Sequence, residues 1–91
     1  MKIKRYQIKI TVDIVHGWTD TIDEVYVPEV DLFINRETCF IGGDVNKGRV
    51  PSEAKEEDIP DSQGIYIVRL ANSLREQAGV IEDIRNVLFK E

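Results

Sequence analysis

The chain has 91 residues, of which 42% are hydrophobic and 32% charged, and its formal net charge at pH 7 is −5. A chain of this length has room for one core, so we expect residues 1–91 to form a single domain. The acidic balance argues against a general nucleic-acid binder, because such a protein needs basic side chains to displace the counterions of the phosphates.

Cysteine content and hydropathy indicate the compartment. Cys39 is the single cysteine, so an intrachain disulfide is impossible and a reducing environment is favoured. No run reaches the roughly 18 apolar residues that a membrane helix needs, and the basic N-terminus lacks the apolar stretch of a signal peptide. We therefore expect a small, acidic, soluble cytoplasmic domain that does not associate with membranes.

The first predicted strand runs from about Lys4 to Val15. Apolar side chains fall at every second position along it: Tyr6, Ile8, Ile10, Val12 and Ile14. A period of two places these side chains on one face of a strand. We expect this face to be buried beneath the apolar C-terminal stripe at residues 67–88.

Three more strands are predicted in the first half of the chain. A loop at residues 16–20 follows the first strand, because glycine, threonine and aspartate favour turns. The next strand, at 22–27, is acidic and precedes Pro28, which is typical of an edge strand. Two further strands, at 30–34 and 38–41, are predicted to form a hairpin across a three-residue turn.

The second half of the chain allows two interpretations. Residues 51–61 are polar and acidic and are expected to form an exposed connection. The β-branched stretch at 64–70 favours a buried strand followed by a helix at 73–90, which is the interpretation we prefer. In the alternative, a helix begins near Asp61 or Ser62 and continues through this stretch.

The expected fold class is α+β, with an antiparallel sheet of four to five strands and one face packed by a C-terminal helix. The C-terminal stripe has heptad spacing: Ile67, Leu70, Leu74, Gln77, Ile81, Ile84 and Leu88. Neighbouring apolar residues give this helix more apolar surface than one sheet face needs. We therefore expect a homodimer or larger homo-oligomer, in which Ile81, Ile84 and Leu88 are candidate contact residues.

One stretch has the glycine spacing of a phosphate loop. In residues 43–50, however, Arg49 and Val50 stand where that loop requires lysine and then serine or threonine. Pro51 follows directly, so the helix N-terminus that would bind a phosphate is not expected. A calcium loop fails because too few ligands are present. Arg49 and Asp44 remain weak candidates for ligand binding.

The only imidazole and the only thiol are His16 and Cys39. They are too few for a structural zinc site, and no third group is evident that would orient them as a nucleophile pair. We therefore expect no catalytic residue, no metal and no cofactor, and hence no enzyme. Trp18, close to His16 in the predicted loop, is either a lid on the core or part of a binding surface.

The favoured function is a non-catalytic protein-interaction or regulatory module that associates with itself and with another protein. Trp18 and His16 are candidate interaction residues, together with the helix positions named above. The alternative function is a small-ligand or nucleotide-binding domain, with its site at a subunit interface near the loop at 16–20.

Overall fold

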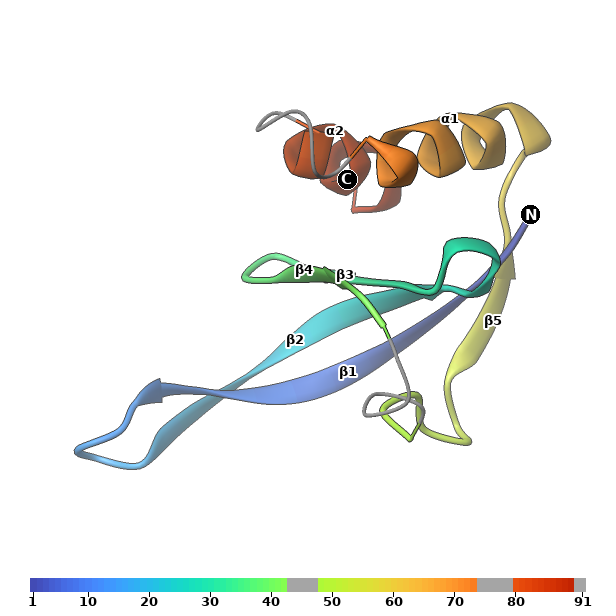
Figure 1. The fold of residues 1–91 in the computed structure, drawn as a ribbon. Coiled ribbons are helices and arrows are strands. Elements are labelled where there is room, and N and C mark those ends of the chain that lie inside the picture. Colours follow the sequence, from blue (N-terminus) through green and yellow to red (C-terminus); the bar gives the residue numbers. More distant parts are fainter. Residues whose placement is uncertain (43–47, 74–79, 90–91) are drawn as a thin grey trace.

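The computed structural model describes residues 1–42, 48–73 and 80–89. Within these ranges the chain forms five strands, one short 3₁₀ helix and two α-helices. In chain order they are β1 (Lys2–Asp13), β2 (Trp18–Val27), η1 (Pro28–Val30), β3 (Leu32–Asn35), β4 (Cys39–Ile41), β5 (Lys55–Asp58), α1 (Asp61–Asn72) and α2 (Val80–Leu88). Both α-helices lie on one side of the sheet (Figure 1), so the expected α+β class is confirmed. None of the helices in the described ranges is long and apolar enough to span a membrane.

The strands pair in the order β4-β3-β2-β1-β5, with every neighbouring pair antiparallel. This order makes β2 an interior strand, so the edge position predicted from its acids and from Pro28 is wrong. The proline comes after the last paired residue of β2, where no ladder hydrogen bond is required. One of the acids, Glu24, is buried and pairs with the partly exposed Arg49.

The sheet contains one strand that the sequence pattern did not predict. Residues 55–58 form β5, in the stretch expected to be an exposed connection, and they pair with the first residues of β1. Ion pairs link the two strands. Nζ of Lys2 lies 3.3 Å from a carboxylate oxygen of Glu56, and the guanidinium of Arg5 lies 3.2 Å from a carboxylate oxygen of Glu57. The basic start of the chain and the acidic run after residue 53 are the sequence signal for this strand.

The main core lies between the helices and one face of the sheet. Its buried members are Ile3, Val25, Val27, Leu32, Ile34, Ile67, Ala71, Ile84 and Leu88. Residues 61–72 are helical, so the preferred strand at 64–70 is wrong and the helix starting at Asp61 is correct. Ile67 and Ala71 are four residues apart and both buried, which is the spacing of one helix face. The expected positions Leu74 and Gln77 lie outside the described residues.

The face of β1 that enters this core is the opposite of the predicted one. Ile3 is buried beneath the helices, so the even-numbered side chains point to the other face of the sheet. These side chains become exposed at the end of the strand and in the turn beyond it, with 56% of Val12 and 89% of Ile14 accessible to solvent. Alternation identifies a common face, but it does not determine which layer covers that face or how far the cover extends.

The second face of the sheet carries a row of aromatic rings and part of the β4–β5 connection. Tyr26 and Phe33 have ring centroids 4.5 Å apart, and Phe33 stacks on Phe40 at 5.1 Å. The guanidinium of Arg49 lies 5.1 Å from the centroid of the Phe40 ring. The cation–π contact therefore holds the part of this connection around Arg49 against the aromatic row of the sheet.

Candidate interaction site

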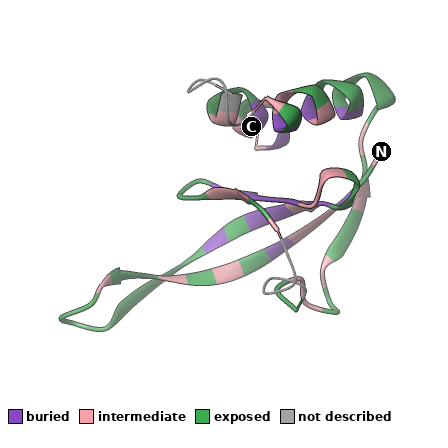
Figure 2. Cartoon of the chain, viewed as in Figure 1, coloured by how far each residue is buried: buried purple, intermediate pink, exposed green. Residues whose placement is uncertain are grey.

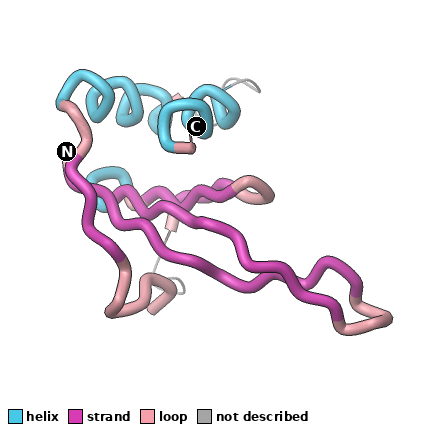
Figure 3. Tube along the Cα trace, turned by 180° about the vertical axis from the view of Figure 1, so that it is seen from behind, coloured by secondary structure: helices cyan, strands magenta, loops and turns pink. Residues whose placement is uncertain are grey.

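The outer halves of β1 and β2 form a two-stranded projection, here called the arm (residues 7–23), which extends away from the body of the molecule (Figure 3). Strand β5 pairs only with residues 2–5, and β3 pairs only with residues 24–27. Within the described part of the chain, neither outer edge of the arm is therefore paired with another strand. The arm is also largely exposed, in contrast to β3 (Figure 2).

The end of the arm is apolar, although it is exposed to water. Four side chains define what we call the arm tip: Val12, Ile14, Val15 and Trp18. Val15 is 89% exposed and Trp18 is 62% exposed, so Trp18 does not act as a lid on the core. Exposed apolar side chains that cluster on a protein surface are typical of a surface that binds another macromolecule, and tryptophan is enriched where such binding is strongest.

Local hydrogen bonds fix the turn that presents the arm tip. Asp13 accepts a bond from the backbone N–H of His16 at 3.1 Å, and its second oxygen lies 2.8 Å from Nδ1 of His16. These bonds hold the pKa of the Asp13 carboxyl below its ordinary value. The imidazole stacks on Trp18 with ring centroids 5.0 Å apart. Gly17 has φ +69°, a left-handed conformation that favours glycine, so this residue is well suited to its place in the turn.

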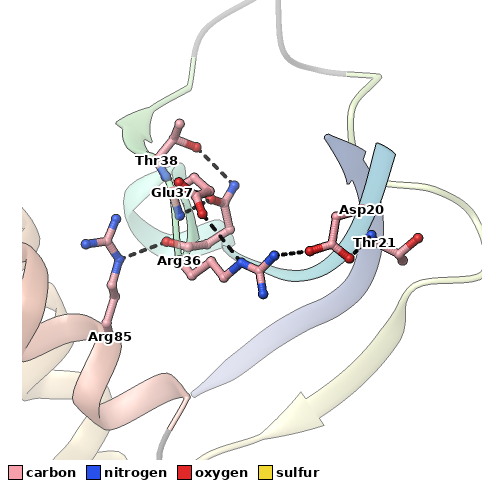
Figure 4. A network of polar contacts seen from close by, with 7 residues as sticks. Asp20, Thr21, Arg36, Glu37, Thr38 and Arg85 are labelled. Atoms are coloured by element: carbon pink, nitrogen blue, oxygen red, sulfur yellow. Dashed lines mark hydrogen bonds and ion pairs between the residues drawn. The ribbon is translucent and has the colours of Figure 1, made fainter. Parts of the chain in front are cut away.

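A chain of polar contacts braces the arm against the body of the molecule (Figure 4). Arg36, in the turn between β3 and β4, pairs with Asp20 on the arm and lowers the pKa of that carboxyl through its hydrogen bond. The neighbouring Asn35 offers its backbone carbonyl to Nε of Arg85, on α2, at 2.8 Å. These contacts connect the arm to α2 through Arg36 and the neighbouring Asn35, at the end of β3.

A buried polar cluster lies at the base of the arm, on the face away from the helices. Glu24 has no exposed surface, and its two carboxylate oxygens accept bonds from Arg49 at 2.8 and 2.9 Å. Tyr6 and Asn35 donate to the same carboxylate. Burial alone would raise the pKa of Glu24, but these hydrogen bonds and the charge of Arg49 outweigh it, so the pKa is lowered.

Arg49 is not assembled with His16 and Trp18, and the loop predicted at residues 16–20 lies at 14–17 because β2 already begins at Trp18. Arg49 binds Glu24 in the body of the sheet, whereas Trp18 is six residues away along the same strand, about 20 Å at 3.3 Å per residue. Asp44, the other weak candidate for ligand binding, lies outside the described residues. A nucleotide or metabolite site that combines Arg49 with His16 and Trp18 finds no support in this arrangement.

The helix positions expected to contact a second copy have a different role. Ile84 is fully buried and Leu88 is 5% exposed, and both belong to the core beneath the helices. Ile81 is partly buried at the margin of the same core. The core of the same chain already covers these side chains.

The chemistry available elsewhere in the described residues is limited. An open cleft of about 540 Å³ lies between the end of α2 and the arm, but its two arginines are already paired, Arg5 with Glu57 and Arg36 with Asp20. Among the described residues, no group of three or more histidine, cysteine or acidic side chains could hold a metal ion. Burial raises the pKa of the Cys39 thiol, which favours its unreactive protonated form.

No protein-family model matches this chain, and neither a curated protein nor a solved structure shows significant similarity to it. The arm tip was only partly evident in the sequence. Trp18 was a candidate, whereas Val12 and Ile14 were expected in the core and Val15 was not singled out.

Proposed function

We propose that this protein is a non-catalytic interaction module that uses the arm tip to bind another protein and that also associates with itself. The observation that carries the proposal is the exposure of Val12, Ile14, Val15 and Trp18 at the end of a braced projection. Leaving these side chains in water costs free energy, at about 25 cal/mol for each Å² of apolar surface. A partner with an apolar recess would remove that cost.

The polar contacts that hold the arm and its turn support the same function. Because Arg36 holds Asp20 and Asp13 holds His16, the arm tip is held in a defined conformation before binding. A pre-organised surface loses less conformational entropy on association, so more of the contact energy appears as affinity. Two strands that project from a sheet are also geometrically suited to enter a recess that a flat sheet face could not reach.

The experiment compares wild type with Val15→Asp at the arm tip and with Ile65→Asp, a control at an exposed isoleucine on α1. Proteins that immobilised wild type retains from an extract of the source cells are identified, purified singly and titrated against each form. Trp18 is the only tryptophan of the chain, so its emission reports contact at the arm tip directly.

We expect at least one purified partner to shift the Trp18 emission to shorter wavelength and to bind Ile65→Asp as tightly as wild type. The same partner should bind Val15→Asp at least tenfold more weakly, which corresponds to about 1.4 kcal/mol. If every retained protein binds the Val15→Asp variant with wild-type affinity, the arm tip is not the binding site and the proposal fails.

A further inference from the structure

Strand β4 forms one outer edge of the sheet, and its outward-facing backbone groups can be assigned. The N–H of Asn35 donates to the carbonyl of Thr38 at 3.0 Å, and Gly42 donates to the carbonyl of Asp31. Antiparallel pairs alternate between hydrogen-bonded and non-bonded positions, so Phe40, midway between these contacts, also bonds towards β3. The N–H and C=O groups of Cys39 and Ile41 consequently point away from the sheet.

The two outer edges of the sheet differ in how they are protected. All four residues of β5 are charged, which is how soluble proteins discourage further strand pairing. The β4 sequence Cys39-Phe40-Ile41 has neither a charge nor a proline, and Ile41 is 47% exposed. In the described ranges, no strand pairs with the outer side of β4. This edge therefore has the chemistry of a strand that accepts a further strand.

We propose that a second copy of this chain pairs with β4, edge to edge and antiparallel, about a two-fold axis beside Phe40. This inference rests on the self-association in the proposed function and names its contact surface. Cys39 then lies opposite Ile41 of the second copy, and the two residues exchange both hydrogen bonds. The two-fold axis generates the same pair between Ile41 and Cys39 of the second copy. Two identical hydrogen-bonded pairs therefore continue the sheet from one molecule into the other.

The side chains favour a second copy over an unrelated peptide. In this register Phe40 faces Phe40 of the second copy at a non-hydrogen-bonded position, where opposing Cα atoms lie only about 4.5 Å apart. The row formed by Tyr26, Phe33 and Phe40 would then continue across the axis into the same row in reverse. Cross-strand aromatic pairs stabilise a sheet, and the two-fold axis supplies this pair without any further sequence requirement.

The short strand sets the strength of the contact. Cys39 and Ile41 of each copy contribute four hydrogen bonds in total, and a three-residue strand buries less surface than the roughly 1,200 Å² of a stable complex. We therefore expect a reversible dimer whose population rises with protein concentration. The arm tip is not part of this contact, because β4 lies two strands away from the nearer strand of the arm.

Two substitutions at Ile41 test the pairing. Ile41→Pro removes an N–H that makes no bond to β3, so it abolishes the outward donor while leaving the β3–β4 ladder intact. Ile41→Lys adds a charge to the edge, in the way that β5 is protected. Ile65→Lys is the matched control, because Ile65 is also exposed but lies on α1. Sedimentation velocity over a concentration series measures the dimer, and amide exchange followed by NMR reports on Cys39 and Ile41.

Wild type and Ile65→Lys should dimerise alike, with protection of the Cys39 and Ile41 amides rising with concentration. Both Ile41 variants should raise the dimer dissociation constant at least tenfold. A wild-type protein that stays monomeric overturns the inference, as does a dimer that both Ile41 variants form equally well. Protection that appears only when another polypeptide is added assigns the edge to peptide binding and also overturns it.

The arm variant separates this inference from the arm proposal. Val15→Asp should dimerise like wild type, and Ile41→Lys should still bind a partner through the arm tip. If Val15→Asp retains partner binding while the Ile41 variants lose the dimer, the arm proposal fails and the β4 contact stands. The reverse pattern, in which Val15→Asp loses the partner and the Ile41 variants keep the dimer, refutes only the β4 contact.

Discussion

At the scale of single residues, the buried carboxylate of Glu24 depends on three donors from different parts of the chain. Tyr6 comes from β1, Asn35 from β3, and Arg49 from the connection that precedes β5. A buried charge without such partners would be costly, so removing any one of the three donors should destabilise the fold. The cluster fixes the position of Arg49, and with it the described end of the connection, on the sheet.

The lowered pKa of Glu24 predicts how stability changes with acid. A carboxyl whose pKa is lower in the folded state contributes stability that is fully present above its unfolded pKa and lost as the pH falls through the folded value. For Glu24 the loss should therefore begin below its ordinary pKa of 4.5. We expect the stability difference between wild type and Glu24→Gln to be largest near neutral pH and to shrink below pH 4.5.

Urea unfolding at a series of pH values, followed by circular dichroism, measures this difference. Glu53→Gln, at an exposed position, is the control and should follow the wild-type profile. A constant difference between wild type and Glu24→Gln from neutral pH into the acid range would contradict the role assigned to the Glu24 carboxylate.

At the scale of elements, the arm is separate from the core that holds the fold together. None of the buried residues of the molecule falls within positions 11–19. The pair of Arg36 with Asp20 connects the arm to the β3–β4 turn just below this segment. The outer arm can therefore change without altering the packing of the sheet against the helices.

Shortening the arm should accordingly leave the fold intact. A variant in which Asn-Gly replaces residues 11–19 keeps Ile10 and Asp20 and closes the hairpin with a favoured two-residue turn. We expect its free energy of unfolding to remain within about 1 kcal/mol of the wild-type value, because no core side chain is removed. Thermal and urea unfolding followed by circular dichroism measure this value. A loss of several kcal/mol would show that the arm contributes to the fold.

The helices were more evident in the sequence than the strand β5. The apolar stripe was evident from its spacing, although the preferred interpretation placed Ile67 in a strand and made Ile84 and Leu88 candidates for contact with a second copy. All three side chains are buried. The strand β5 was not evident, because Lys55 and its acidic neighbours have no apolar alternation and are held by pairing with the basic start of β1. Local patterns reveal which side chains share a face, whereas distant charge pairing and the choice of covering layer depend on the whole fold.

At the scale of the whole molecule, the sheet has two unlike faces. The helices cover one face with an apolar core, and the aromatic row with the Glu24 cluster occupies the other. The two faces of β1 therefore contribute very differently to stability. Ile3 is fully buried beneath the helices, and Ile10 is half-buried on the opposite face.

This difference can be measured with one pair of identical substitutions. Ile3→Ala should lower the free energy of unfolding by about 2–5 kcal/mol, the range for removing a buried aliphatic side chain. Ile10→Ala should cost about 1 kcal/mol, because burial of Ile10 is incomplete. Urea unfolding of both variants gives the two values. If Ile10→Ala lowered the free energy of unfolding more than Ile3→Ala, the even-numbered face of β1 would be the core face.

The pairing of the first strand with residues near position 58 also constrains the order of assembly. Lys2 lies opposite Asp58, so this edge of β1 cannot pair with β5 until residue 58 has been synthesised. The β1–β2 hairpin, by contrast, closes over a short loop and can form early in synthesis, since local contacts require less loop-closure entropy. In a nascent chain the β1–β2 hairpin would thus form while the outer edge of β1 is still unpaired. The acidic strand β5 would pair with that edge later.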